Sequence, residues 1–142
     1  MENKLKFNEY AKFYDLAYGN KNYVNEILFI SKKLNINKNS KILDLGCGTL
    51  RHSIYLSKKV KKILGIDLSK NMLKIARDKV NKNKLSKKKI FLKYANIIDF
   101  TTSQKFNVAY SLFDVICLLI NDVDIKKRPW SRFFCVAMTL TR

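Results

Sequence analysis

The chain has 142 residues and a formal net charge of +18, and 47% of its residues are hydrophobic. This length corresponds to one domain, and the apolar content suffices for a packed core, which excludes a disordered chain. No apolar run approaches the roughly 18 residues of a membrane-spanning helix, and the first residues form no hydrophobic signal region. We therefore expect a cytoplasmic protein without a membrane partner.

The positive charge comes mainly from lysines, which are spread along the chain among asparagines and isoleucines. AT-rich coding sequence favours all three residue types, and few arginines or interleaved aromatic residues accompany the lysines. We therefore expect a small-molecule partner rather than nucleic acid, although the charge can attract an anionic substrate. Cys47, Cys117 and Cys135 show no metal-ligand spacing, and their odd number argues against a disulfide framework. Reduced thiols and no metal site are the expectation.

Two amphipathic segments occupy residues 1–40. Helical spacing of apolar residues predicts one helix over residues 7–18 and a second over residues 22–34. Both should cover one end of the sheet predicted downstream. The segment also holds a group of tyrosines: Tyr10, Tyr14, Tyr18 and Tyr23. These side chains are interpreted either as packing residues or as a lid whose hydroxyls reach a ligand.

Strand and helix patterns alternate over residues 41–127. The predicted strands are residues 41–45, 63–66, 90–94 and 106–112. The predicted helices are residues 49–58, a segment that starts after an N-cap at Ser69, and a run from residue 115 to 120. The inward face of the second of these helices should consist of Met72, Ile75, Ala76, Lys79 and Val80. This alternation predicts an α/β fold with a mostly parallel sheet and helices on both faces.

Ligands of parallel sheets bind beyond the carboxyl ends of the strands. Gly46 and Gly48 follow the first strand, and because they lack Cβ the backbone can turn sharply and lie against a ligand. The Asp67 carboxylate ends the second strand, where it can accept hydrogen bonds from two ribose hydroxyls. Asn96 follows the third strand and offers an adenine edge both a donor and an acceptor. The sequence thus predicts a nucleoside-like ligand.

Two such ligands compete for this arrangement. A dinucleotide fingerprint requires a third glycine, and Arg51 stands at that position. The run Leu-Asp-Leu-Gly-Cys-Gly-Thr at residues 43–49 instead closely resembles motif I of the class I S-adenosylmethionine-dependent methyltransferases, and residues 66–77 resemble the second motif of that family. The resemblance extends over residues 10–124. Residues 14–18 and 111–113 also resemble a branch of small-molecule methyltransferases that includes sugar N-methyltransferases.

The resemblance implies a Rossmann-like methyltransferase fold, S-adenosylmethionine as the cofactor and a role for each site residue. Asp44 and the glycine turn would face the methionine moiety, with Asp44 near its ammonium group, and Tyr14 or Tyr23 would meet the carboxylate or the acceptor. Asp67 would hold the ribose, Asn96 the adenine. Leu68 and Met72 would supply apolar contacts to the base. The cofactor-binding residues predicted in this way are Tyr14, Asp44, Gly46, Cys47, Gly48, Asp67, Leu68, Met72, Asn96, Ile97 and Ser111.

The sequence departs from the family pattern at two places. Leu50 occupies the usual third small position of the turn, where a bulky side chain is acceptable if it points into the core. Residues 128–142 lack the lysines and asparagines that are frequent in the preceding chain. Complete members of the family continue through further strands. We therefore expect a truncated fold whose last strands are missing and whose activity is impaired. The tail could still add a strand beside the fourth strand over residues 133–140, or remain an exposed apolar segment.

No catalytic base can be assigned, because the only histidine, His52, starts a helix behind the expected cofactor position. The leading interpretation is methyl transfer to a small polar metabolite such as a sugar or an amine. An RNA methyltransferase is the alternative that the charge suggests. A third is an inactive fragment that serves only as a binding module.

Overall fold

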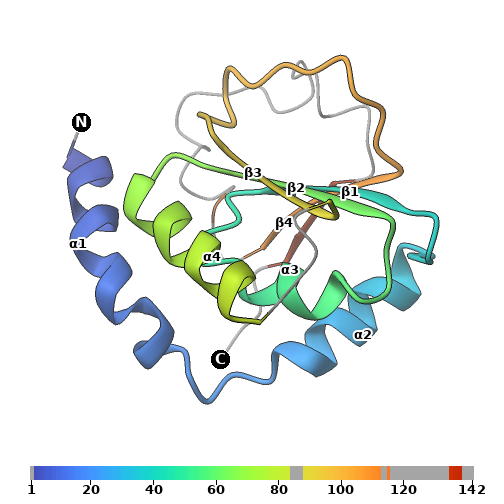
Figure 1. The fold of residues 1–142 in the computed structure, drawn as a ribbon, viewed down its shortest axis with the longest axis horizontal. Coiled ribbons are helices and arrows are strands. Elements are labelled where there is room, and N and C mark those ends of the chain that lie inside the picture. The colour runs from blue at the N-terminus through green and yellow to red at the C-terminus, as the bar shows by residue number, and fades with distance from the viewer. Residues whose placement is uncertain (1, 84–87, 113–114, 116–134, 139–142) are drawn as a thin grey trace.

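The computed structural model describes residues 2–83, 88–112, 115 and 135–138, and it shows helices packed against a parallel sheet (Figure 1). The helices are α1 (Glu2–Ala17), α2 (Tyr23–Lys33), α3 (Arg51–Leu56) and α4 (Lys70–Lys82). The strands are β1 (Lys41–Leu45), β2 (Lys62–Asp67), β3 (Ile90–Tyr94), β4 (Val108–Leu112) and β5 (Cys135–Met138). The predicted α/β class is confirmed.

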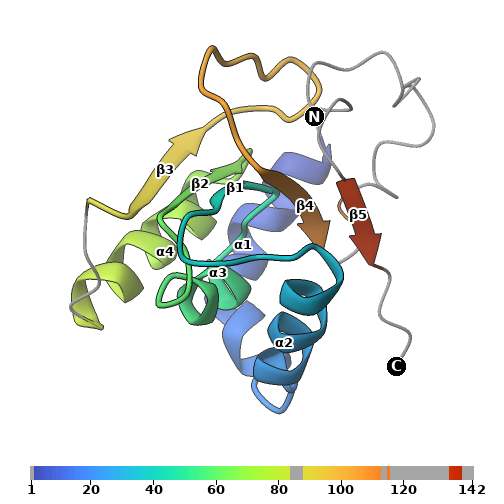
Figure 2. The same cartoon turned by 90° about the vertical axis from the view of Figure 1, so that its right-hand side faces the viewer.

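The sheet has the order β3-β2-β1-β4-β5, and every pair of neighbouring strands is parallel. In the centre, Leu43 of β1 lies between Leu64 of β2 and Ala109 of β4. Figure 2 shows β5 beside β4, at the opposite end of the sheet from β3. The predicted strand over residues 133–140 is therefore confirmed for Cys135–Met138.

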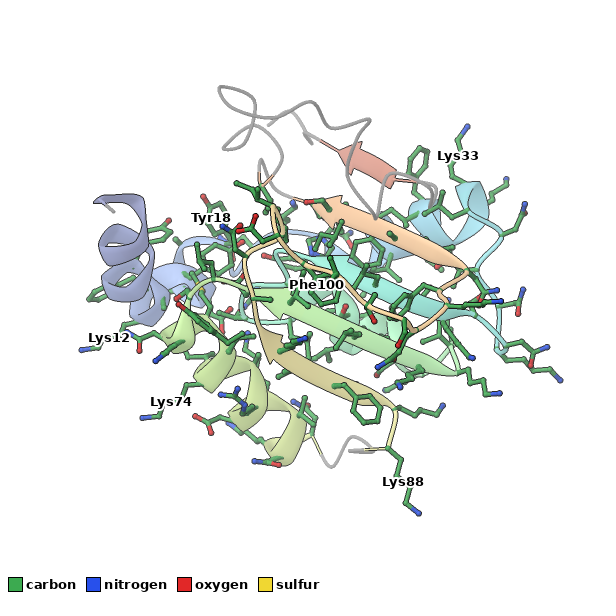
Figure 3. The ribbon with its side chains drawn as sticks, turned by 90° about the horizontal axis from the view of Figure 1, so that it is seen from above. Lys12, Tyr18, Lys33, Lys74, Lys88 and Phe100 are labelled. Carbon is green, nitrogen blue, oxygen red and sulfur yellow. The ribbon has the colours of Figure 1, made fainter. Side chains whose placement is uncertain are left out.

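Alternation along the strands gives the sheet two different apolar faces. One face, which includes Ile42 of β1, packs against Ile27 and Ile30 of α2 and Leu56 of α3. All described helices lie on this side of the sheet (Figure 1). The opposite face, which includes Leu43, is covered by side chains from the β3–β4 connection, namely Ile97, Phe100 and Phe106. Figure 3 shows Phe100 over the strands. The helix predicted over residues 115–120 lies outside the described residues, except for Val115.

Side-chain caps define the first residues of α2 and α4. The Asn22 side chain accepts a hydrogen bond from the Asn25 N–H at 3.0 Å and caps α2, and the Ser69 hydroxyl accepts one from the Met72 N–H at 3.2 Å and caps α4. Both helices therefore start where the sequence predicts. The fourth strand is shorter than predicted and begins at Val108.

The buried face of α4 includes one residue, Leu73, that was not predicted. Leu73 is fully buried, and it joins Met72, Ala76 and Val80 in the core. Ile75 and Lys79 are only partly buried. The Lys79 ammonium instead reaches sideways to the turn that follows β1. Periodicity thus predicted the helix and three of its buried residues, Met72, Ala76 and Val80, but it missed Leu73.

The two N-terminal helices differ in what they cover: α2 packs on the sheet through Ile27 and Ile30 as predicted, whereas α1 packs on another helix. α2 lies against α3, and α1 lies beside α4 (Figures 1 and 2). No helix in the described part of the chain is long and apolar enough to cross a membrane. The division into segments 1–40, 41–127 and 128–142 stays a prediction.

Candidate functional site

The turn after β1 depends on two glycines for different reasons. Gly46 (φ 74°) and Gly48 (φ 53°) both adopt the left-handed conformation that favours glycine. A Cβ on Gly46 would lie 2.5 Å from Val115 Cγ1, whereas a Cβ on Gly48 would meet no atom of the described residues within 4 Å. Gly46 therefore permits close packing inside the protein. Gly48 leaves its backbone open to a ligand.

Asp67 fastens this turn to the end of β2. One carboxylate oxygen accepts a hydrogen bond from the Gly48 N–H at 2.8 Å, and the other accepts one from the Ser69 N–H at 2.7 Å. Burial raises the pKa of Asp67, and these main-chain donors oppose the rise. A carboxylate has about four acceptor positions, and the Leu68 N–H also donates to Asp67, so acceptor capacity remains for a ribose hydroxyl. The structure thus brings the predicted residues Gly48 and Asp67 into direct contact.

Asp44 lies on the helix-covered face of β1, beneath α3, and only 4% of it is exposed. Its Oδ2 accepts hydrogen bonds from the Ser53 hydroxyl at 2.6 Å and from the Tyr110 hydroxyl at 3.3 Å. Ser53 Oγ and Tyr110 Oη are also 2.7 Å apart. Burial raises the pKa of Asp44 to about 7, despite these hydroxyl donors. Sequence analysis missed both hydroxyls, because only strand register and helix packing bring them to Asp44.

The residues predicted to hold an adenine are split between edge and core. The Ala95 N–H donates to the Asp67 carbonyl oxygen at 3.1 Å, which places Asn96 beside the end of β2. The Asn96 Oδ1 already accepts a hydrogen bond from the Ile98 N–H at 3.0 Å. Leu68 is exposed, whereas Met72 and Ile97 are buried. Asn96 and Leu68 are therefore accessible near Asp67, and Met72 and Ile97 support them from the core.

Three other predicted residues have side chains that contact other parts of the protein. The Ser111 hydroxyl is buried and donates to the Leu45 carbonyl oxygen at 2.9 Å, so it serves the contact between β4 and β1. The Cys47 side chain is buried against Gly65, and burial raises the pKa of its thiol. The Tyr14 ring packs between Tyr10 and Tyr18, with centroids 5.9 and 4.9 Å away, and burial raises its pKa. Their roles toward a cofactor stay predictions.

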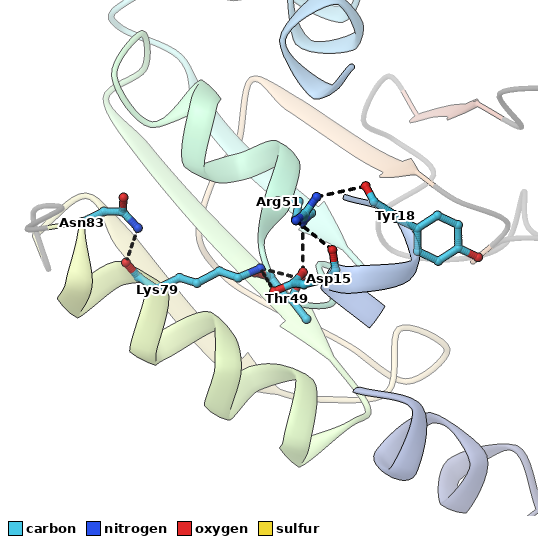
Figure 4. A network of polar contacts seen from close by, with 6 residues as sticks. All are labelled: Asp15, Tyr18, Thr49, Arg51, Lys79 and Asn83. Atoms are coloured by element: carbon cyan, nitrogen blue, oxygen red, sulfur yellow. Dashed lines mark hydrogen bonds and ion pairs between the residues drawn. The ribbon is translucent and has the colours of Figure 1, made fainter. Parts of the chain in front are cut away.

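A polar cluster that sequence analysis did not identify joins α1 to the glycine turn (Figure 4). Asp15 Oδ1 accepts hydrogen bonds from Thr49 Oγ1 at 2.7 Å and from Arg51 Nε at 3.0 Å, and Lys79 Nζ lies 2.5 Å from Asp15 Oδ2. The same ammonium donates to the Thr49 carbonyl at 3.1 Å, and Arg51 donates to the Tyr18 carbonyl at 3.0 Å. The Asp15 carboxylate of α1 therefore pairs with two cations, Arg51 and Lys79, beside the turn.

The pKa values of Asp15 and Lys79 are both lowered, for different reasons. Burial raises the pKa of Asp15, but hydrogen bonds from Lys79 and Thr49 and the nearby cations outweigh that effect and lower it. The pKa of Lys79 is also lowered, first by burial and then by the charge of Arg51, although Asp15 opposes the change. A simple ion pair would raise the pKa of the lysine, so burial is the main cause of the lowered value here.

His52 lies on the α2 side of α3. Its Nε2 is 2.7 Å from Glu26 Oε2, and its ring packs edge-on against Tyr23 at a centroid distance of 4.8 Å. Burial lowers the pKa of His52, and Glu26 opposes that shift. This environment ties the histidine to α2 and not to the edge that holds Asp67. The described residues contain no group of three side chains that could hold a metal ion.

The fold and this site match a known family. Residues 42–128, more than half of the chain, match a methyltransferase domain, and the chain therefore belongs to the methyltransferase-domain family. An S-adenosylmethionine-dependent methyltransferase from Clostridium acetobutylicum is similar in structure: it is 26% identical, with a TM-score of 0.64, and the match covers 80% of this chain and 46% of that one.

Two further relatives are more distant or cover less of the chain. An amino pentose methyltransferase from Micromonospora echinaspora, solved with bound S-adenosylmethionine, shares the fold at 22% identity and a TM-score of 0.61, over 72% of this chain and 42% of that one. A demethylmenaquinone methyltransferase from Geobacillus sp. (strain WCH70) is 37% identical over 62 residues, which are 42% of this chain and 26% of that protein. The chain thus spans less than half of these relatives' lengths.

S-adenosylmethionine is the cofactor of this family, and the residues at the open edge fit it. The space over Gly48 admits a ligand against the backbone, and Asp67 retains acceptor capacity for a ribose. Asn96 and Leu68 adjoin Asp67 and match the polar edge and apolar face of an adenine.

Proposed function

We propose that this chain binds S-adenosylmethionine at the carboxyl edge of its sheet, and that it serves methyl transfer to a small polar metabolite such as a sugar or an amine. One observation carries the proposal: Asp67 holds Gly48 by a 2.8 Å hydrogen bond while the outer side of Gly48 stays open. This arrangement joins a ribose acceptor to a ligand-facing backbone.

Each end of the cofactor has a candidate partner in the chain. Asp67 would accept hydrogen bonds from the ribose hydroxyls, and Asn96 would meet the adenine edge. Asp44 would act through its charge from beneath the glycine turn, because its carboxylate is buried and already accepts two hydroxyl donors. A positive ligand ammonium nearby would favour the ionised form of Asp44.

The cofactor supplies a methyl group on a sulfonium, and alignment of the acceptor with it can provide much of the acceleration. The chain therefore has to position two ligands and exclude water. An amine acceptor needs only to arrive deprotonated, whereas a hydroxyl usually needs a general base. His52, paired with Glu26 on the α2 side, is not placed for that role.

Two kinds of observation support a small acceptor. Residues 14–18 and 111–113 resemble a small-molecule branch of the family, and the named relatives include an amino pentose methyltransferase and a demethylmenaquinone methyltransferase. Measuring methyl transfer to a panel of amino sugars, simple amines and quinols would rank the acceptor classes. Turnover of quinols alone would exclude the sugar or amine assignment.

Calorimetric titration with S-adenosylhomocysteine tests the cofactor proposal. We expect saturable binding by the wild-type chain and none by Asp67→Ala. Asp78→Ala, which removes an exposed carboxylate of α4, should bind like the wild type. A folded wild-type sample that gives no heat at millimolar ligand would refute the proposal. For a binding module, Asp67→Ala should leave association with a protein partner untouched.

An RNA methyltransferase is the second candidate, and one structural observation favours it. Although the lysines are spread along the sequence, Lys41, Lys62 and Lys89 come together where β1, β2 and β3 begin. Such a gathering of positive charge can neutralise phosphates. Tight RNA binding that weakens steeply with salt would favour this candidate. Weak binding without sequence or structure preference would leave the small-molecule proposal in place.

A further inference from the structure

Leu50 adopts a strained backbone conformation directly after the glycine turn of residues 46–48, which we call the cofactor turn. It is not a glycine, yet it has a φ of 68° and a ψ of 23°, in the left-handed region. A residue with a Cβ is disfavoured in this region relative to glycine. The conformation persists only where surrounding contacts determine it. At Leu50 those contacts have to come from the core and from the neighbouring residues.

Burial provides one of these contacts. Leu50 is fully buried and packs with Leu73, Ala76, Val80 and Ile90 on the helix-covered side of the sheet. The departure from a small residue at this position is therefore accommodated by a side chain in the core. Burial fixes the side chain, but it does not by itself fix the two peptide groups on either side of Leu50.

Those neighbours are held by a single carboxylate from α1. Asp15 Oδ1 accepts hydrogen bonds from Thr49 Oγ1 at 2.7 Å and from Arg51 Nε at 3.0 Å, which are the residues directly before and after Leu50. Arg51 Nη2 also donates to the Asp15 carbonyl oxygen at 3.1 Å. Lys79 completes the arrangement, because its ammonium contacts Asp15 and donates to the Thr49 carbonyl at 3.1 Å.

We propose that Asp15 is a positioning residue for the cofactor turn: through Thr49, Arg51 and Lys79 it holds Leu50 in a conformation that glycine would adopt without help. This arrangement links the placement of α1 to the shape of the turn that contains Gly48. The stability part of the inference is independent of any ligand, whereas its effect on cofactor affinity rests on the proposed function.

A double-mutant cycle tests the coupling between Asp15 and the backbone at Leu50. Leu50→Ala and Leu50→Gly both delete the buried side chain, but only glycine removes the preference against a positive φ. We expect Asp15→Ala to lower the folding equilibrium constant about tenfold in the wild type and in L50A, and by less than about threefold in L50G, as measured by urea unfolding. Equal losses in L50A and L50G would overturn the proposal.

Hydrogen exchange provides a test that needs no substitution at Leu50, should L50G fail to fold. The Leu50 N–H donates to the Cys47 carbonyl at 2.9 Å, and the Ile54 N–H donates to the Leu50 carbonyl at 3.0 Å. Asp15→Ala should accelerate exchange at both amides relative to the amides of β1, whereas Asp78→Ala should not. Unchanged exchange at these amides in Asp15→Ala would overturn the proposal.

Affinity for S-adenosylhomocysteine separates positioning of the turn from general stabilisation. Asp15→Ala should weaken binding about tenfold under conditions where the variant is fully folded, L50G should reduce that loss, and Asp78→Ala should not change binding. Unchanged affinity in a folded Asp15→Ala chain would confine Asp15 to stability. If the wild type itself does not bind, the proposed function fails, and the unfolding cycle still decides whether Asp15 holds the turn.

Discussion

The two edges of the sheet carry charge in different ways. At the carboxyl edge, Asp67 and Asp15 are held by donors at 2.7–3.0 Å, and the latter faces two cations. At the amino edge, the strands begin among lysines such as Lys41 and Lys89, and Figure 3 shows Lys88 at the start of β3, on the same side of the molecule as Lys33 of α2.

The amino edge is more weakly organised. Lys62 donates to Gln104 Oε1 at 3.1 Å in an exposed contact, and its ammonium lies 4.3 Å from the centre of the Phe91 ring. Exposed contacts of this kind contribute little stability, because water screens the charge. The number of charges is therefore a poor guide to the proposed site. We place that site at the carboxyl edge because the Asp67 carboxylate is partly buried and fixed by main-chain donors.

The largest loss of ligand affinity should come from removing the Asp67 carboxylate, which main-chain donors fix at the carboxyl edge. Asp67→Ala should weaken affinity for S-adenosylhomocysteine by at least about tenfold, because a hydrogen bond to a charged group contributes about 1.5–3 kcal/mol and at least one is expected from the ribose. Calorimetric titration measures this loss. A change of less than tenfold in a folded variant would show that Asp67 only supports the turn.

Substitution of Gly46 should mainly reduce stability, whereas substitution of Gly48 should mainly reduce ligand affinity. Gly46→Ala should destabilise the fold by about 3 kcal/mol or more, because its Cβ would lie 2.5 Å from Val115 Cγ1 in addition to the positive φ. Gly48→Ala should cost about 1–2 kcal/mol, because only the backbone preference opposes it. It should nevertheless reduce ligand affinity by filling the open side. Urea unfolding and titration of both variants check this, and equal destabilisation would contradict it.

The buried Asp44 should make stability depend on pH. Its folded pKa of about 7 lies above the ordinary value of 3.8, so the folded state binds the proton more tightly. That stabilisation is fully present below about pH 4 and is lost as pH rises through 7, with a total of up to about 4 kcal/mol. Compared with Asp44→Asn, the wild type should therefore lose stability between pH 5 and pH 8 in urea unfolding. A constant difference between the two proteins would contradict this account.

The same carboxylate should link cofactor binding to protons. If the ligand ammonium favours ionised Asp44, affinity for S-adenosylhomocysteine should fall as pH decreases below 7, and binding near pH 6 should release a proton. Titration in buffers of different ionisation enthalpy detects this release. Asp44→Asn is the control, since it should bind without that proton.

The smallest effect is expected at the amino edge. Changing Lys41, Lys62 and Lys89 together to glutamine should leave affinity for S-adenosylhomocysteine unchanged and alter the free energy of unfolding by about 0.5 kcal/mol or less per site. At low salt the variant should gain stability, because like charges repel less. Unfolding at two salt concentrations measures this. A large loss of ligand affinity would show that the amino edge also serves the site.

Much of the fold could be predicted because its signals are local. The apolar run of β1, the Ser69 cap of α4 and the position of Asp67 depend on neighbouring residues, whose spacing directly limits backbone conformation. The same signals indicated a glycine turn next to a ribose acceptor. They could not show which side chains were already engaged inside the protein, as Ser111 is with the Leu45 carbonyl.

The sequence by itself determined the class of fold, because strand and helix periodicity lie in local stretches of the chain. The resemblance of residues 43–49 and 66–77 to a known family gave the cofactor, and the glycines and terminal carboxylates predicted the edge where it binds. Only the tertiary structure decided that Ser53 and Tyr110 enclose Asp44, that Asp15 holds both neighbours of Leu50, and that dispersed lysines meet at the amino edge. These contacts join residues far apart in the chain. They depend on strand register and helix rotation, which packing of the whole core sets and no local pattern encodes.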